Sequence, residues 1–313
     1  MTSQITVSAP GKIIISGEHA VVYGYPALIC AVNLYAKVGI EITKGNLDIY
    51  PDQAKDIVLR SLKNTERFLD TKFEGLKINL NSEIPIGCGM GSSAAVSVAV
   101  ATALMNHKAG KIILKHINEI AYETEKYYHV NSSGADPAIS TYGGFLWYRK
   151  ETTNFKVLTP LKPKINLASF IIINTGKPDE NTGQMVEGVL KFYKNNPAKT
   201  EKTFQKIENI TRSFLRYLLK EESVSLTELI RENERYLEEL EVVSDSTKSL
   251  IKKIEKIGGA AKITGAGGRK ENSGILLAYH PDKKRLVTFV REKKLTVLPA
   301  KFTSKGVKVE KNS

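Results

Sequence analysis

Apolar and polar residues alternate with the period of a β-strand at two places in the N-terminal third of the chain. Ile5 and Val7 alternate with polar neighbours, the pattern breaks at 8–11, and an apolar run resumes at 12–16. Residues 76–80 alternate in the same way, as a strand with one buried face does. We therefore expect strands at both places, the first of them interrupted at 8–11.

The rest of the chain divides into further strands and amphipathic helices. Alternation and short apolar runs predict strands at 33–52 (a pair around the turn at Gly45 and Asn46), 145–148, 155–158, 167–174, 274–278 and 297–302. Apolar residues at helical spacing predict helices at 54–69, 94–105, 112–128 and 283–291, and several between 185 and 256, one of them capped by Ser225. The prolines at 160–163 predict a linker, and the basic end at 305–313 predicts a solvated tail.

A glycine-rich segment stands between the strand at 76–80 and the helix at 94–105. Its residues are Pro85, Ile86, Gly87, Cys88, Gly89, Met90, Gly91, Ser92, Ser93 and Ala94. The three glycines allow positive φ and leave backbone N–H groups free where the helix starts, and such a place binds phosphate. The two serines can cap the helix or offer a hydroxyl to Mg²⁺. A plain turn that joins a strand to a helix fits the same glycines.

Two common phosphate-binding motifs do not match this segment. A Walker A loop ends in Gly-Lys-Ser/Thr, and no lysine occurs between Ile84 and Asn106. A dinucleotide fingerprint that began at Gly87 would need glycine at position 92, where the chain has serine. The segment therefore belongs to neither the P-loop nor the Rossmann class.

Several ionisable residues lie in or beside apolar stretches. Lys12 opens the apolar run of the first strand, and Glu18 and His19 follow it. Isolated charges beside a buried strand are costly unless they are paired or functional, although a solvated strand end is the alternative. Asp136 stands in a tight polar turn, where an aspartate can also serve as a turn former. Glu125 lies on a predicted helix, and most helical glutamates are solvated.

Length and composition indicate an intracellular, globular chain. With 313 residues, 42% of them hydrophobic, it can bury the cores of two domains. The net charge of +13 is spread along the chain and not gathered in one arginine-rich tract, so we expect no nucleic-acid partner. Cys30 and Cys88 are too few for a disulfide framework. Since the chain has no long apolar run and no secretory signal at its start, we expect no membrane partner and a cytoplasmic location.

Three signatures of the chain resemble those of the GHMP kinase superfamily, small-molecule kinases for galactose, homoserine, mevalonate and phosphomevalonate. Residues 85–95 resemble its second signature. Residues 10–12, 17–24 and 26–28 resemble the first signature, in the form typical of mevalonate kinases. Residues 131–136 resemble the Asn-x-Ser-Gly-x-Asp segment of mevalonate kinases, and residues 258–268 resemble the third signature. The third departs from the family because the polar insert 269–273 precedes the next apolar strand. We expect this insert to be exposed.

The resemblance implies a role for each candidate site residue. Lys12 and Asp136 would act on the acceptor hydroxyl, and residues 85–94 would wrap the phosphates of ATP. Ser92 and Glu125 would hold Mg²⁺, since Glu125 stands eleven residues before Asp136, the spacing in the resembling kinases, and Glu123 is the fallback. The acceptor pocket would be lined by Glu18, His19, Tyr142 and Thr182, with Thr175 as a further candidate.

A lysine and an aspartate are sufficient protein groups for this chemistry. Phosphoryl transfer through a loose transition state needs alignment, neutralisation of charge, and a place for the hydroxyl proton. Lys12 and Asp136 would supply the last two. Whether Asp136 removes the proton early or mainly orients the hydroxyl stays open at this stage.

The resemblance also implies the fold and the reaction. The fold would be α+β, the two-domain GHMP kinase fold, with an ATP-binding domain at 1–160 resembling the ribosomal protein S5 domain 2-like fold and an α/β-sandwich domain at 161–313. The reaction would be transfer of the γ-phosphoryl group of ATP to the 5-hydroxyl of (R)-mevalonate, on the route to isoprenoids. The alternatives are another GHMP kinase, acting on phosphomevalonate or a sugar, and a non-catalytic nucleic-acid-binding or regulatory protein. A homodimer is left open.

Overall fold

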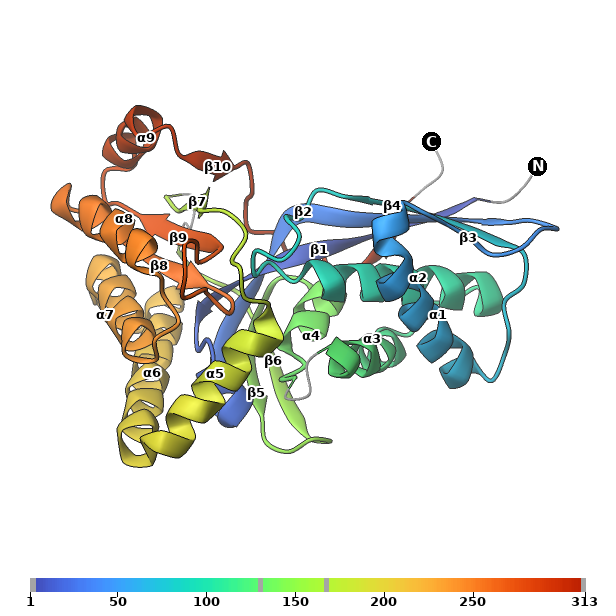
Figure 1. The fold of residues 1–313 in the computed structure, drawn as a ribbon, viewed down its shortest axis with the longest axis horizontal. Helices are drawn as coiled ribbons and strands as arrows, with labels where there is room; N and C mark the ends of the chain where they lie inside the picture. Colours follow the sequence, from blue (N-terminus) through green and yellow to red (C-terminus); the bar gives the residue numbers. More distant parts are fainter. Residues whose placement is uncertain (1–3, 129–131, 166–168, 311–313) are drawn as a thin grey trace.

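The computed structural model of the chain describes residues 4–128, 132–165 and 169–310, in which two β-sheets lie side by side with helices around them (Figure 1). The larger sheet has the order β11-β1-β2-β4-β3, with β5 pairing with β2 and β6 with β5. Its strands are β1 (Ile5–Ser16), β2 (Ala27–Ile42), β3 (Asp48–Tyr50), β4 (Leu76–Ser82), β5 (Phe145–Lys150), β6 (Lys156–Leu161) and β11 (Lys308–Val309). The smaller sheet has the order β10-β7-β9-β8. Its strands are β7 (Ile171–Asn174), β8 (Ala260–Thr264), β9 (Ile275–Tyr279) and β10 (Thr296–Leu298).

Helices cover one face of the larger sheet and surround the smaller one (Figure 1). Under the larger sheet lie α1 (Lys55–Leu69), α2 (Ser92–Ala109), α3 (Leu114–Tyr128) and α4 (Ala135–Tyr142). Around the smaller sheet lie α5 (Thr182–Asn195), α6 (Pro197–Leu218), α7 (Leu226–Glu239), α8 (Asp245–Lys256) and α9 (Lys283–Glu292). The short 3₁₀ turns η1 (Ala20–Tyr23) and η2 (Asp52–Ala54) complete the order.

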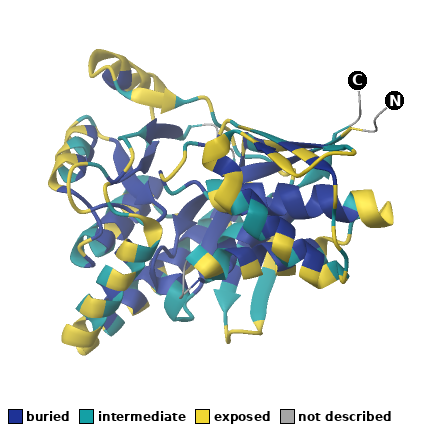
Figure 2. Cartoon of the chain, turned by 45° about the vertical axis from the view of Figure 1, so that its right-hand side comes forward, coloured by how far each residue is buried: buried dark blue, intermediate teal, exposed yellow. Residues whose placement is uncertain are grey.

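The apolar helix α2 forms the centre of the larger half. It is buried from Ala94 to Met105 and packs against β1, β2, α1, α3 and α4, as expected of a helix that is apolar on all sides. Figure 2 shows the buried residues concentrated in the sheets and in the helix beneath them, and the exposed residues on the outer helices and loop tips. Because α6 also contacts β1 and β2, one core connects the two sheets.

Most of the predicted elements are confirmed. Helices occur at the predicted places as α1, α2, α3 and α9, and the long helical stretch after 182 is divided into α5 to α8. Ser225 caps α7, since its side chain accepts a hydrogen bond from the backbone N–H of Glu228. The prediction that a serine could cap α2 is wrong, because Gly91 occupies the N-cap position and no side chain forms a capping hydrogen bond there. The hydroxyls of Ser92 and Ser93 are thus not used for capping.

Three strand predictions are corrected. The predicted break at 8–11 is only a register shift between Pro10 and Gly11 within a continuous β1. The strands at 33–52 exist, but β4 lies between β2 and β3, so they do not form a hairpin. Pro160 is in β6 and not in a linker, which is tolerated because β6 pairs only with β5.

The predicted solvated tail at 305–313 is wrong up to residue 310. Strand β11 pairs with β1, and a Cβ added to Gly306 would lie 2.3 Å from the carbonyl oxygen of Thr141. Ser8 Oγ also donates to Glu310 Oε1 at 2.6 Å. The end of the described chain is therefore part of the larger sheet, while 311–313 lie outside the described residues. The predicted strand at 297–302 is limited to β10 and one bridge from Phe302 to Val32, and the start of the one predicted at 167–174 also lies outside them.

Candidate active site

A cavity of about 810 Å³ lies where the two sheets meet. The larger half lines it with residues of β1, the glycine segment, α2, α3 and α4, and the smaller half with 177–182, 265 and 266. Most of the predicted site residues are among its walls. The cavity therefore brings together segments that are far apart in the sequence.

The glycine segment forms a turn that only glycines can make at three positions. Gly87, Gly89 and Gly91 have φ of 74°, 87° and 70°, values that L side chains rarely adopt. A Cβ on Gly91 would lie 2.9 Å from Cγ of Lys12, and one on Gly89 would lie 2.8 Å from the carbonyl oxygen of Thr264. The segment is thus packed between β1 on one side and the end of β8 on the other.

Eight residues of the predicted phosphate-binding segment line the cavity, from Ile86 to Ala94 with the exception of Cys88. Pro85 and Cys88 lie in the same segment but outside the cavity wall. Ser92 and Ser93 face the cavity at the start of α2. The unpaired N–H groups of this first helical turn, together with the positive end of the helix dipole, favour an anion there.

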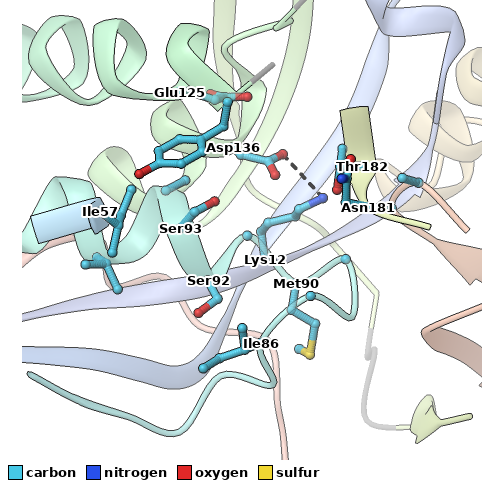
Figure 3. Close-up of a pocket in the computed structure, with 18 of the residues that line it drawn as sticks. Lys12, Ile57, Ile86, Met90, Ser92, Ser93, Glu125, Asp136, Asn181 and Thr182 are labelled. Carbon is cyan, nitrogen blue, oxygen red and sulfur yellow. Dashed lines mark ion pairs between the residues drawn. The ribbon is translucent and has the colours of Figure 1, made fainter. Parts of the chain in front are cut away.

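Lys12 and Asp136 face each other across the cavity (Figure 3). Lys12 Nζ and Asp136 Oδ1 are 3.3 Å apart, and the side chains are 3% and 29% exposed. The backbone N–H of Lys12 also donates to the carbonyl oxygen of Met90 at 2.9 Å. The lysine is therefore fixed directly to the glycine segment, and its ammonium and the aspartate carboxylate lie beside any group bound there.

Glu125 reaches the same cavity from α3. Its Oε2 is withdrawn from solvent and has no hydrogen-bond partner among the described residues. Burial and the neighbouring charge of Asp136 raise the pKa of Glu125 to about 8. A buried carboxylate oxygen without a partner, in one cavity with the hydroxyl of Ser92, fits a hard cation such as Mg²⁺.

The fallback Glu123 does not fit the cation. Its carboxylate is exposed and pairs with Lys126 at 2.5 Å, outside the cavity. Within 4–128, 132–165 and 169–310, no three His, Cys, Asp or Glu side chains gather as a metal site. A cation in this cavity would therefore need oxygens from a bound nucleotide in addition to those of the protein.

The four residues predicted to line the acceptor pocket divide into two inside and two outside. His19 lines the cavity, its Nε2 lies 3.0 Å from the carbonyl oxygen of Ala266, and burial lowers its pKa to about 4. Thr182 lines it at the first turn of α5. Glu18 and Tyr142 do not line the cavity. Glu18 is fully buried against Lys262, and Tyr142 is the last residue of α4, at the opposite end of the helix from Asp136. The further candidate Thr175 instead donates to the carbonyl oxygen of Gly274 at 2.8 Å.

Behind His19 lies a buried cluster formed by Glu18, Lys262 and Glu234. Lys262 Nζ bonds to Glu18 Oε1, and Glu234 Oε2 accepts the backbone N–H of Ile263 at 2.9 Å. All three side chains are inaccessible to solvent. Burial raises the pKa of Glu18, against the opposing charge of Lys262, and raises that of Glu234 to about 8. The cluster ties the turn before His19 to β8 and α7.

Replacing Glu234 with Gln is expected to make the free energy of unfolding less dependent on pH. The raised pKa means that folded Glu234 keeps its proton up to about pH 8, whereas the unfolded chain releases it near 4.5. Its contribution to stability is therefore fully present below about pH 4.5 and is lost as the pH rises to 8, by at most about 1.4 kcal/mol per unit. Urea unfolding from pH 5 to 9 measures this, and equal slopes in the two proteins would contradict it.

Sequence reasoning missed several residues of the cavity wall. One end of the cavity is apolar and is lined by Ile57, Leu80, Ile86, Val96 and Tyr128, among which only Ile86 was a site prediction. Lys177 and Asn181 also line it. Asn181 caps α5 with Gln184, and the Asn-Thr-Gly-Gln run that encodes this capping box could have indicated it.

Comparisons with known proteins agree with this geometry. A model described as the GHMP kinases N terminal domain matches residues 56–144. A mevalonate kinase of Archaeoglobus fulgidus is 34% identical over 300 residues, 91% of this chain and 95% of that one. The structure of L. major mevalonate kinase in complex with R-mevalonate has a TM-score of 0.78 at 24% identity, with 94% and 92% of the two chains covered. Streptococcus pneumoniae phosphomevalonate kinase also has a TM-score of 0.78, at 17% identity, with 95% and 99% covered.

The fold and the cavity define a small-molecule phosphotransferase of the GHMP class. The chain belongs to the mevalonate kinase family of the GHMP kinases. The predicted α+β GHMP kinase fold and the predicted enzyme class are confirmed. As a kinase, the chain uses ATP as cosubstrate.

Proposed function

We propose that the chain transfers the γ-phosphoryl group of ATP to the 5-hydroxyl of (R)-mevalonate, forming a phosphate ester and ADP. The observation that carries this proposal is the Lys12–Asp136 pair at 3.3 Å beside the glycine segment. The 34% identity to a mevalonate kinase over nearly the whole chain supports mevalonate as the acceptor. The reaction belongs to the route from mevalonate to isoprenoids.

The nucleotide would lie along the glycine segment. Its phosphates would accept hydrogen bonds from the backbone N–H groups at 87–93, and its base would occupy the apolar end of the cavity near Ile57 and Tyr128. Glycine is needed in this segment because a side chain on Gly91 would meet Lys12 and one on Gly89 would meet the end of β8. This placement directs the γ-phosphoryl group towards the Lys12–Asp136 pair.

Asp136 would accept the proton of the acceptor hydroxyl on a carboxylate oxygen. The hydroxyl oxygen forms a bond to the γ-phosphorus while the bond from that phosphorus to the bridging oxygen breaks, and the electron pair goes to ADP. Lys12 would stabilise the negative charge on the attacking and transferred oxygens. Since both groups are held by rigid elements, β1 and α4, little reorganisation is needed at the moment of transfer.

Ser92 and Glu125 would hold Mg²⁺, for which the partnerless Glu125 oxygen is the structural support. When bound, the ion supplies charge neutralisation for the phosphate oxygens. On the acceptor side, neutral His19 and Thr182 would bind the polar groups of mevalonate. Glu18 and Tyr142 are not proposed as contacts, because the cavity does not reach them.

We also propose the division into an ATP-binding half at 1–160 and a second half at 161–313, which corresponds to the two sheets apart from β11.

None of the helices described in the structure is both long and apolar enough for a membrane span. Free, buried Cys30 and Cys88 support a reducing compartment, the cytoplasm. A homodimer remains a proposal for measurement by light scattering.

An acceptor panel tests the proposed function. We expect the chain, with ATP and Mg²⁺, to release ADP with (R)-mevalonate at a kcat/KM at least about 100-fold above that with phosphomevalonate, galactose or homoserine, a difference of about 3 kcal/mol. The expectation rests on the 34% identity to a mevalonate kinase over nearly the whole chain, since a site built for one acceptor leaves its polar groups unpaired with another. Turnover on another alcohol but not on mevalonate would reject the proposal, and no turnover on any acceptor would favour a non-catalytic protein.

A further inference from the structure

Lys177 approaches the glycine segment from the opposite half of the molecule. It belongs to the connection between β7 and α5 and lines the cavity. A Cβ built on Gly87 would lie 2.9 Å from Cε of Lys177 and 3.4 Å from its Cγ and Cδ. The aliphatic part of the lysine therefore lies along Gly87, in the space that a larger residue would fill.

The ammonium of Lys177 has no hydrogen-bond or ion-pair partner in the described part of the chain, unlike that of Lys12, which pairs with Asp136. The two acidic residues nearest in sequence are engaged elsewhere. Asp179 Oδ2 lies 3.8 Å from Nζ of Lys270, and Glu180 Oε2 accepts the backbone N–H of Arg269. The unpaired ammonium of Lys177 thus belongs to a side chain that lies along the glycine segment, where backbone N–H groups are free to bind an anion.

The polar insert holds the segment that carries Lys177. A Cβ on Gly268 would lie 2.8 Å from Cβ of Pro178, and one on Gly176 would lie 2.9 Å from Nδ2 of Asn272. Gly176 and Gly268 therefore have no room for a side chain, and the chain at 268–272 packs closely against the backbone on both sides of Lys177. The predicted exposure of the insert holds for 269–271, whereas Ser273 is buried.

The insert is itself anchored to the glycine segment and to α8. Gly274 accepts the backbone N–H of Thr175 at 2.8 Å, and a Cβ on Gly274 would lie 2.7 Å from the carbonyl oxygen of Cys88. Ser273 Oγ accepts the backbone N–H of Ser244, the cap of α8, at 2.9 Å. These bonds determine where the Lys177 segment lies relative to the phosphate-binding loop.

We propose that Lys177 is a second phosphate-binding cation, which contacts the nucleotide at the Gly87 end of the loop while Lys12 serves the reacting end at Gly91. The two lysine stems contact glycines at opposite ends of the same turn. Their ammonium groups therefore face different parts of a polyphosphate. The inference rests on the proposed function, since it takes the cavity as a nucleotide site.

Nucleotide binding to Lys177→Met tests the inference without turnover. Methionine keeps most of the unbranched stem and removes the charge. We expect the Kd for ATP and ADP, measured calorimetrically, to rise about tenfold, as for loss of one charge-assisted contact made by an exposed side chain. The Kd for adenosine, which has no phosphate, should stay within about twofold, and Lys177→Arg should keep most of the ATP affinity.

The matched control is Lys191→Met, an exposed lysine on α5 that pairs with Glu187 and lies outside the cavity. It should leave all three Kd values unchanged, and circular dichroism should show that both variants fold. Unchanged ATP affinity in Lys177→Met would overturn the inference, as would an equal loss for adenosine, which would indicate a structural effect. If the chain binds ATP but does not phosphorylate mevalonate, the proposed acceptor is wrong, whereas the inference about Lys177 is unaffected.

A double-mutant cycle tests the positioning by the insert. Asn272→Ala removes the side chain that lies over Gly176 and should weaken ATP binding about threefold. In a Lys177→Met background the same change should have no further effect, because the positioned group is already absent. Additive losses would show that Asn272 acts independently of Lys177 and would overturn that part of the inference.

Discussion

Replacing Asp136 with Asn is expected to lower kcat for mevalonate phosphorylation by about a thousandfold while ATP binding stays within a few fold. An amide cannot accept the hydroxyl proton, and general-base catalysis contributes on the order of 10²–10⁴. The variant also leaves Lys12, whose side chain is 3% exposed, without its counter-charge at 3.3 Å. Coupled ADP detection measures turnover, and calorimetry measures nucleotide binding.

The control for this substitution is Glu123→Gln, which removes an exposed carboxylate outside the cavity and should leave kcat unchanged. The pH profile separates the two roles that remain for Asp136. If Asp136 is the base, the decrease of kcat at low pH should be absent in Asp136→Asn. If Asp136 only orients the hydroxyl, kcat should be lower at every pH but should still decrease at low pH as in the wild type. Undiminished ADP release by Asp136→Asn would remove the assignment of Asp136 as the group that accepts the proton.

Replacing Lys262 with Met is expected to cost about 3–5 kcal/mol of unfolding free energy, the usual effect of removing one partner of a buried ion pair. Both Lys262 and Glu18 are 0% exposed. The carboxylate would be left without its partner, and its Oε2 already lacks a bond among the described residues. Urea unfolding followed by circular dichroism measures the loss.

The double variant Glu18→Gln with Lys262→Met keeps this prediction testable if the single variant does not fold. A neutral pair should recover a large part of the lost stability, because no uncompensated charge stays buried. Lys248→Met is the matched control, since this lysine pairs with an exposed Asp245 and should cost less than about 1 kcal/mol. Wild-type stability of Lys262→Met would show that the pair contributes nothing.

Local rules predicted the conformation of the glycine segment well. Three glycines that need positive φ, a strand before them and an apolar helix after them are all short-range properties. The structure has the same order, β4, the turn and α2, with the three φ values positive. The sequence alone could therefore place the loop and the start of its helix without any information about the rest of the fold.

Predictions about partners across the chain were less successful. Glu18 was expected in the acceptor pocket, but its partner Lys262 comes 244 residues later and withdraws it from the cavity. Lys177 had no signal of its own, since its position depends on Gly87 and on the insert. The family resemblance, and not the pattern of residues, supplied the roles of Lys12, Asp136 and Glu125, for which the structure provides one shared cavity.

The pairing of β11 with β1 has a consequence for synthesis of the protein. Ser8 bonds to Glu310, a separation of 302 residues, so during translation the outer edge of β1 has no neighbour until almost every other element has left the ribosome. Unpaired strand edges attract other chains. The nascent polypeptide thus carries an unpaired strand edge on β1 until residues 308 and 309 have left the ribosome and can pair with it.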